Sequence, residues 1–139
     1  PLQGSFFFST EPVIEPKIII NEIFAHDENP PTEFSEIPDW IELYNPSNTE
    51  INLNNFFLTD DFDNLLKWKI PDNTSIESEE YLIIWADDYD EGPGQIYTRP
   101  YWPWDDYTTQ HYHTNFKIDA DGEQLALSKA DQTGDYILI

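Results

Sequence analysis

The chain has 139 residues, no cysteine, and 28 acidic against six basic residues, which gives a formal net charge of −22. This length suits one domain with a single core, and the lack of cysteine excludes disulfides and thiolate metal sites. The charge disfavours binding to nucleic acid or to anionic membrane surfaces, because both need Lys and Arg to displace counterions.

The first 38 residues are expected to contain one strand. Residues 1–16 hold three prolines and three consecutive phenylalanines without a helical or strand period, a composition typical of a linker or an arm. Lys17 to Ala25 is short and rich in β-branched residues, which predicts the first core strand. Residues 26–38 contain three further prolines and are expected to form a loop.

The segment from Asp39 to Tyr44 alternates in character. Ile41 and Leu43 fall on one face of an extended chain, and Glu42 and Tyr44 fall on the other, which predicts a strand with one buried side. The cluster at 45–48 (Asn-Pro-Ser-Asn) predicts a turn, because proline lacks an N–H and short polar side chains bond to nearby backbone.

Similar segments recur at 54–60, 67–71, 81–87, 113–118 and 121–127, and this regular spacing is typical of an all-β sandwich. No helix is expected, and residues 75–80 are expected to form a turn into the next strand. Residues 119–123 are expected to form a hairpin turn in which Gly122 has a positive φ. The predicted core residues are Ile18, Ile20, Ile41, Leu43, Leu53, Phe56, Leu58, Trp68, Ile70, Leu82, Ile84, Phe116, Leu125 and Leu127.

Five strings carry a resemblance to a known family: DWIELYNPS, NNFFLTDD, KWKIPDNTSI, EEYLIIWADD and HTNFKIDADGEQLALS, in that order. Together they resemble the lamin tail domain in its bacterial form. The resemblance implies an immunoglobulin-like β-sandwich of about seven to nine strands with no catalytic machinery, found mostly in secreted or surface proteins. We therefore expect a Pro-rich arm at 1–16 and a sandwich at 17–139, with a long acidic and aromatic loop insertion at 87–112.

Acidic loops make Ca²⁺ the one candidate cofactor. Asp60, Asp61 and Asp63 lie within one turn, and Ca²⁺ prefers six to eight oxygen ligands. The full calcium-loop pattern is not present, since Leu65 stands where that pattern has glycine. The acidic residues at 87–91, with Glu22 and Asp39, are further candidate ligands. The alternative is a solvated acidic rim.

Histidine offers little for a transition metal. The sequence has three histidines, His26, His111 and His113, whereas a zinc or copper site needs three or four converging ligands. For His113 the resemblance implies a packed or capping role.

The loop at 97–107 is unusually aromatic, with Tyr101, Trp102, Trp104 and Tyr107 among prolines and carboxylates. Stiff, exposed rings beside carboxylates suit stacking on sugar faces, which suggests a carbohydrate-binding platform. The alternative is that the rings form a small core for the insertion itself.

These observations favour a non-catalytic, extracellular or cell-surface module that mediates attachment within a larger bacterial protein. The expected partners are other domains of the same chain, a surface protein or a polysaccharide, without nucleic acid or direct membrane insertion. Two alternatives are a carbohydrate-binding module that uses the 97–107 loop and a calcium-dependent hydrolase. The sequence contains no GxSxG motif and no Gly-rich phosphate loop.

Overall fold

The computed structural model describes residues 17–25, 39–88, 112–131, 133 and 135–139. In these ranges the chain forms nine β-strands and no helix, so the all-β prediction is confirmed. The strands are β1 (Ile19–Phe24), β2 (Asp39–Tyr44), β3 (Ile51–Asn52), β4 (Phe56–Thr59), β5 (Trp68–Lys69), β6 (Ser75–Ile76), β7 (Tyr81–Ala86), β8 (Ala126–Ala130) and β9 (Tyr136–Leu138).

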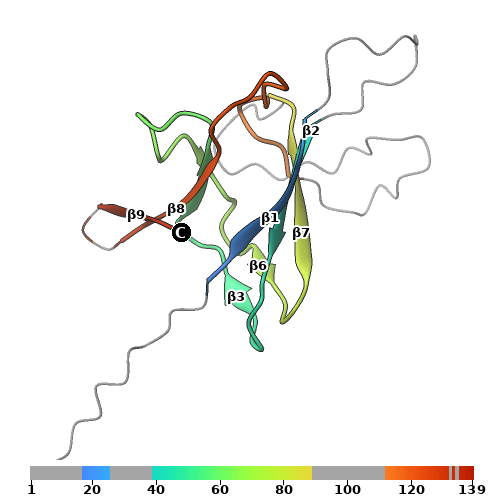
Figure 1. The fold of residues 1–139 in the computed structure, drawn as a ribbon. Coiled ribbons are helices and arrows are strands. Elements are labelled where there is room, and N and C mark those ends of the chain that lie inside the picture. The colour runs from blue at the N-terminus through green and yellow to red at the C-terminus, as the bar shows by residue number, and fades with distance from the viewer. Residues whose placement is uncertain (1–16, 26–38, 89–111, 132, 134) are drawn as a thin grey trace, which may run out of the picture.

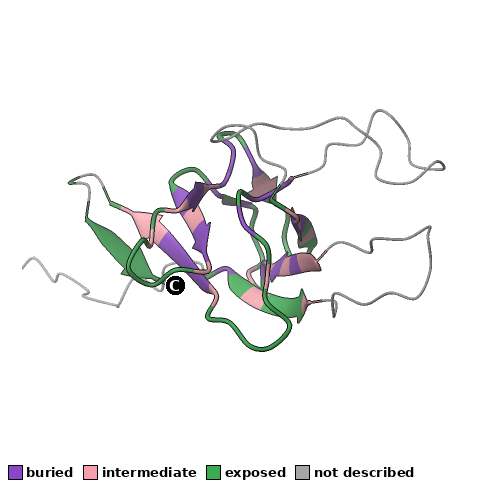
Figure 2. Cartoon of the chain, turned by 90° about the horizontal axis from the view of Figure 1, so that it is seen from above, coloured by how far each residue is buried: buried purple, intermediate pink, exposed green. Residues whose placement is uncertain are grey.

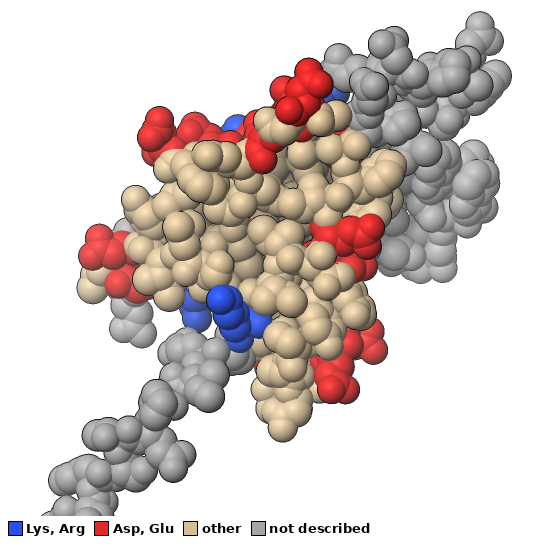
Figure 3. Space-filling view, viewed as in Figure 1, with Lys and Arg blue, Asp and Glu red and all other residues tan. Residues whose placement is uncertain are grey.

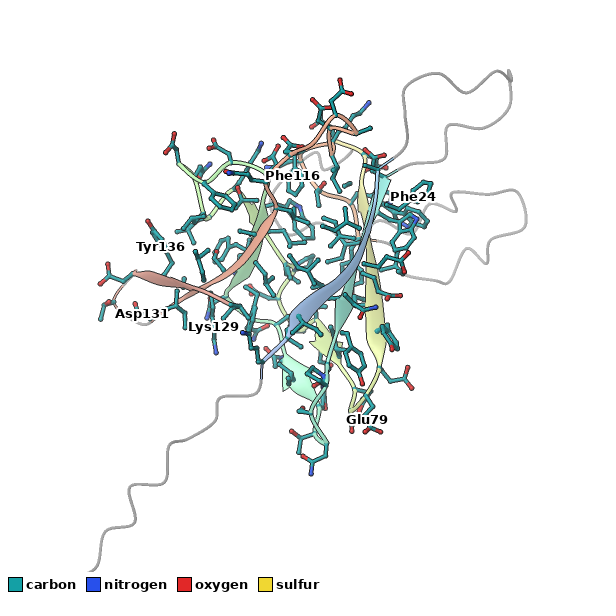
Figure 4. All side chains as sticks on the ribbon, viewed as in Figure 1. Phe24, Glu79, Phe116, Lys129, Asp131 and Tyr136 are labelled. Atoms are coloured by element: carbon teal, nitrogen blue, oxygen red, sulfur yellow. The ribbon has the colours of Figure 1, made fainter. Side chains whose placement is uncertain are left out.

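The strands form an immunoglobulin-like β-sandwich. One sheet has the order β1-β2-β7, and the other has the order β5-β4-β8-β9. A short pair, β3-β6, lies at one end of the sandwich (Figure 1). Every pairing between named strands is antiparallel, and the apolar side chains of the two larger sheets fill the space between them (Figure 4).

The buried residues lie at the centre of the molecule and exposed residues at its rim (Figure 2). Eleven of the predicted core residues are buried: Ile18, Ile41, Leu43, Leu53, Phe56, Leu58, Trp68, Ile70, Ile84, Phe116 and Leu127. The other three, Ile20, Leu82 and Leu125, are partly buried and pack against that core. The prediction omitted Ile51, Ile76, Ala86 and Ala126, which are also buried.

The alternation predicted for β2 is present. Ile41 and Leu43 are fully buried, whereas Glu42 between them is only half-buried. In the register of β2 with β7, Ile41 lies opposite Ile84, and Glu42 lies opposite Ile83 on the other face. The period of two along a strand therefore separates a core face from an outer face.

The prediction of a hairpin around Gly122 is wrong in part. Gly122 does adopt a positive φ of 112°, and its N–H donates to the carbonyl of Asp119 across 3.2 Å. The segment before this turn, however, does not pair with β8. It makes only isolated bridges to the other sheet, at His113 with Trp85 and at Lys117 with Asp87, while β8 pairs with β4 and β9.

The turn therefore carries the chain from one sheet to the other. Side-chain hydrogen bonds, and not pairing between two strands, hold this turn. The Asp119 carboxylate accepts the N–H of Asp121, and the Glu123 carboxylate accepts the N–H of Asp119, each at 2.9 Å. Local hydrogen bonds of this kind satisfy backbone groups that a hairpin would otherwise pair.

The expected arm at 1–16 and all but the ends of the insertion at 87–112 lie outside the described residues. The division of the chain into arm, sandwich and insertion stays a prediction.

Candidate interaction surface

The β1-β2-β7 sheet presents one face to the core and a second face away from it. The antiparallel registers align the residues of this second face in three rows across the strands. The rows are Ile19, Tyr44 and Tyr81; Glu22, Glu42 and Ile83; and Phe24, Trp40 and Trp85. We call these nine residues the outer face.

Aromatic rings stack within two of the rows. The rings of Tyr44 and Tyr81 lie 4.5 Å apart between centroids at an interplanar angle of 24°. The rings of Phe24 and Trp40 lie 5.7 Å apart at 9°. Figure 4 shows Phe24 pointing away from the opposite sheet. Ring pairs held across neighbouring strands are fixed in direction, because the backbone ladder sets the spacing of their Cβ atoms.

The outer face is apolar at several exposed positions. Tyr81 is 52% exposed, and Ile19 and Ile83 are each 36% exposed. Single exposed apolar residues are normal on a protein surface, but here they lie in adjacent rows of one sheet. Exposed aromatic and aliphatic side chains grouped in this way are typical of a binding surface.

Carboxylates occupy the middle row. Glu22 lies opposite Glu42, and the amide Nδ2 of Asn21 donates to Oε1 of Glu42 across 2.7 Å. The register shifts between Ile20 and Glu22, so Asn21 forms a bulge in β1. The bulge turns the Asn21 side chain towards Glu42 and fixes the carboxylate between the two ring pairs.

The acidic turn after β4 does not direct its carboxylates to one point. Asp60 forms an ion pair with Lys67 at 2.5 Å, and Oδ1 of Asp61 accepts the N–H of Asp63 at 2.9 Å. Within the described part of the chain, no group of three or more His, Cys, Asp or Glu residues is placed to hold a metal ion. On the side shown in Figure 3 the acidic side chains lie at several separate margins.

The other candidate ligands in the described residues do not form a group of three or more that could hold a metal ion. Nδ1 of His113 contacts Oδ2 of Asp87 at 2.8 Å, and the histidine is 3% exposed, which agrees with a packed role. Asp39 accepts the N–H of Ile118 at 3.2 Å, whereas Glu22 lies on the outer face. His26 and His111 lie outside the described residues.

A comparison with protein-family models decides the family. The model described as Lamin Tail Domain matches residues 14–137, nearly the whole chain. The chain belongs to the lamin tail domain family. No curated protein and no solved structure is significantly similar to it.

Membership confirms the resemblance seen in the five sequence strings and agrees with the immunoglobulin-like sandwich. The family is not a known enzyme family, and a domain of this kind is consistent with a non-catalytic interaction module. Among the described residues of this lamin tail domain, no helix has the length and apolar character that a membrane crossing requires.

Tyr101, Trp102, Trp104 and Tyr107 lie outside the described residues, so their role in this lamin tail domain stays a prediction. The described residues on either side of 89–111 lie close together. The N–H of Trp85 donates to the carbonyl of Tyr112, and the N–H of Thr114 donates to the carbonyl of Trp85, both at 2.8 Å. The residues that flank the predicted insertion therefore lie beside the row that contains Trp85.

Sequence reasoning missed the outer face. The alternation in each strand indicated which residues point away from the core, but their grouping into rows depends on register. Tyr44 and Tyr81 come together only because β2 and β7 pair along their full length. The signal available beforehand was the aromatic residues at outward positions of both strands.

Proposed function

We propose that this lamin tail domain is a non-catalytic attachment module of a larger bacterial protein, acting outside the cell or on its surface. The observation that carries the proposal is the outer face of the β1-β2-β7 sheet, where Ile19, Tyr81 and Ile83 are exposed beside stacked rings. Aromatic residues contribute large contact areas at low conformational cost, which makes such a face suited to binding.

The charge of the chain supports an exterior location. A net charge of −22 in a chain of 139 residues causes strong self-repulsion, which salt screens and divalent cations neutralise. The same charge opposes nucleic acid and anionic membrane surfaces as partners. The partners proposed are therefore other domains of the same chain, a surface protein or a polysaccharide.

The test uses the full-length protein in its own cells. Antibodies against residues 17–139 should label intact cells or the secreted protein, and deletion of these residues should reduce retention at the site of attachment. A Tyr44→Ala/Tyr81→Ala double variant should reduce retention as strongly as the deletion. Labelling that appears only after permeabilisation would overturn the location, and full retention of the double variant would overturn the role of the outer face.

The 97–107 loop provides a second candidate surface for carbohydrate, based on its sequence alone. The sequence observation that favours it is the group of Tyr101, Trp102, Trp104 and Tyr107 beside two prolines. A calcium-dependent hydrolase is not proposed, because the family is not a known enzyme family.

A further inference from the structure

We propose that the end of the outer face formed by Ile19, Tyr44, Tyr81, Glu42 and Ile83 binds a neutral polysaccharide. This group is named the tyrosine platform. The inference rests on the proposed attachment function and adds to it the chemical class of the ligand and the residues that bind it.

The tyrosine platform is pre-organised. Tyr44 and Tyr81 lie directly opposite each other on antiparallel strands, with ring centroids 4.5 Å apart. Each ring therefore supports the other, and little side-chain freedom remains to be lost when a ligand binds. Tyr81 still exposes 52% of its surface, so part of a fixed ring is available for contact.

The platform combines two kinds of contact that sugars use. A pyranose ring has an apolar face of C–H groups, which packs on aromatic and aliphatic surface, and a rim of hydroxyls, which form hydrogen bonds. Tyr81, Ile19 and Ile83 supply the exposed apolar surface. Glu42 lies in the next row, held by Asn21 at 2.7 Å, and a carboxylate accepts hydroxyl hydrogens strongly.

Charge restricts the class of ligand. Glu22 and Glu42 face each other in the middle row of a protein with a net charge of −22. An anionic polymer would meet like charges there, and so would a second copy of this chain docked through the same face. A neutral polysaccharide meets no such repulsion, and its hydroxyls provide hydrogen-bond donors for both carboxylates.

The shape of the platform favours an extended ligand. Three antiparallel strands form one sheet face, and side chains two residues apart on a strand are separated by about 6.6 Å. A linear chain that lies along β2 and β7 passes from the tyrosine row to the carboxylate row. Successive sugar rings can then contact different rows of the same face.

Affinity gel electrophoresis of the 139-residue protein tests the proposal. Separate gels contain hydroxyethylcellulose, mixed-linkage β-glucan, xylan or galactomannan, and alginate serves as the anionic comparison. We expect at least one neutral polymer to retard the protein and alginate not to. Tyr81→Ala should weaken the retardation at least tenfold in apparent Kd.

Tyr136→Ala is the matched control, because Tyr136 is 51% exposed, almost the same as Tyr81, but lies on β9 of the other sheet. It should be retarded like the unmodified protein. Thermal melting of both variants should stay within a few degrees of the parent, which shows that the fold is intact. A Tyr44→Phe variant keeps the stacked ring and should retain binding, because the ring and not its hydroxyl supports Tyr81.

Glu42→Gln and added salt together distinguish a sugar from a basic protein partner. The glutamine keeps a hydrogen-bond acceptor without the charge, so binding of a neutral polysaccharide should fall only severalfold. Sodium chloride should leave that binding nearly unchanged, whereas binding of a basic protein would weaken steeply with salt, because its long-range attraction depends on the net charge of −22, of which Glu42 supplies one unit.

Three results would overturn the inference: no retardation by any of the four neutral polymers, retardation by alginate only, or equal weakening by Tyr81→Ala and Tyr136→Ala. If these occur while Tyr44→Ala/Tyr81→Ala still abolishes retention of the full-length protein, the ligand is not a neutral polysaccharide bound at the tyrosine platform and the attachment function stands. If retention is also unchanged, both proposals fail.

Discussion

The side-chain amide of Asn45 donates from Nδ2 to the main-chain carbonyl of Ile76 across 2.9 Å, although the two residues are 31 positions apart. The same nitrogen lies 2.8 Å from the carbonyl of Thr49 and 2.9 Å from that of Glu77. Oδ1 accepts both the N–H and the hydroxyl of Ser47, at 2.9 and 2.7 Å. Asn45 thus joins the turn after β2 to the end of β6 and to the residue that follows it.

We predict that Asn45→Ala strongly destabilises the domain. Asn45 is fully buried, and its removal leaves the buried Ile76 carbonyl without this donor. Unsatisfied buried polar groups cost about 1–3 kcal/mol each, and a network costs more than one such group. The expected fall in Tm is roughly 10 °C or more.

Asn48→Ala is the control for this variant, because Asn48 lies in the same turn and is exposed. Its Tm should match that of the parent within about 2 °C. Equal melting temperatures for the Asn45 and Asn48 variants would show that the network contributes nothing to stability.

Two buried threonines should respond oppositely to the same substitution. Thr59 Oγ1 lies 2.8 Å from the carbonyl of Asp61 and 2.9 Å from that of Asn64, and it accepts the N–H of Asp61 at 2.9 Å. Thr74 is also buried, but its hydroxyl has no hydrogen-bond partner among the described residues. Thr59→Val should therefore cost about 1–3 kcal/mol, whereas Thr74→Val should be neutral or stabilising.

Urea unfolding of the two valine variants measures this difference, since the midpoint shifts at constant slope when only stability changes. A loss of stability in Thr74→Val as large as that in Thr59→Val would contradict the assignment. It would mean that the Thr74 hydroxyl has a bonding partner after all.

Calcium provides a third prediction. Asp60 is paired with Lys67, and Asp61 already accepts the N–H of Asp63, so this turn does not offer three carboxylates to one ion. We expect any calcium-specific rise in Tm of the parent protein to persist in an Asp61→Asn/Asp63→Asn variant. A true site at hundredfold excess of calcium over Kd would add ~2.7 kcal/mol, a shift of several degrees.

Sodium chloride at matched ionic strength is the control, because it reproduces the general screening of negative charge. A rise with calcium that exceeds the rise with sodium, and that disappears in the double variant, would establish a site at Asp60, Asp61 and Asp63.

Local patterns in the sequence were enough to predict the faces of β2. Ile41 and Leu43 are buried and Glu42 is not, because side-chain direction alternates along any extended segment. The buried Trp68 was likewise predictable from its place in an alternating segment, between Lys67 and Lys69. These properties depend on neighbouring residues only.

Relationships between distant residues could not be predicted in the same way. The contact of Asn45 with Ile76 requires knowledge of how two connections pack, and a buried asparagine looks like any other turn residue in a sequence. The bulge at Asn21 sets the register of Glu22 with Glu42, and no local pattern in the sequence of β1 predicts this bulge. The tyrosine platform likewise depends on the pairing of β2 with β7, which are far apart in the sequence.

The aromatic insertion gives the last prediction. The variants Trp102→Ala and Trp104→Ala distinguish two hypotheses: that the rings form a small internal core, and that they form an exposed platform for sugars. A buried ring truncated to alanine costs ~3–5 kcal/mol and releases the loop to proteolysis. Truncation of an exposed ring costs little stability, so Tm should stay within about 2 °C. If the exposed ring contacts a polysaccharide, its loss should abolish that binding.

We expect the internal core for at least one of the two tryptophans. Tyr112 and Thr114, at the end of the predicted insertion, are hydrogen-bonded to Trp85, close to its predicted start, so both described flanks lie next to an aromatic row of the sheet. Limited proteolysis and thermal melting of both variants, with Tyr136→Ala as the exposed-ring control, measure the outcome. A loss below ~1 kcal/mol in both tryptophan variants would show that neither ring is part of a core.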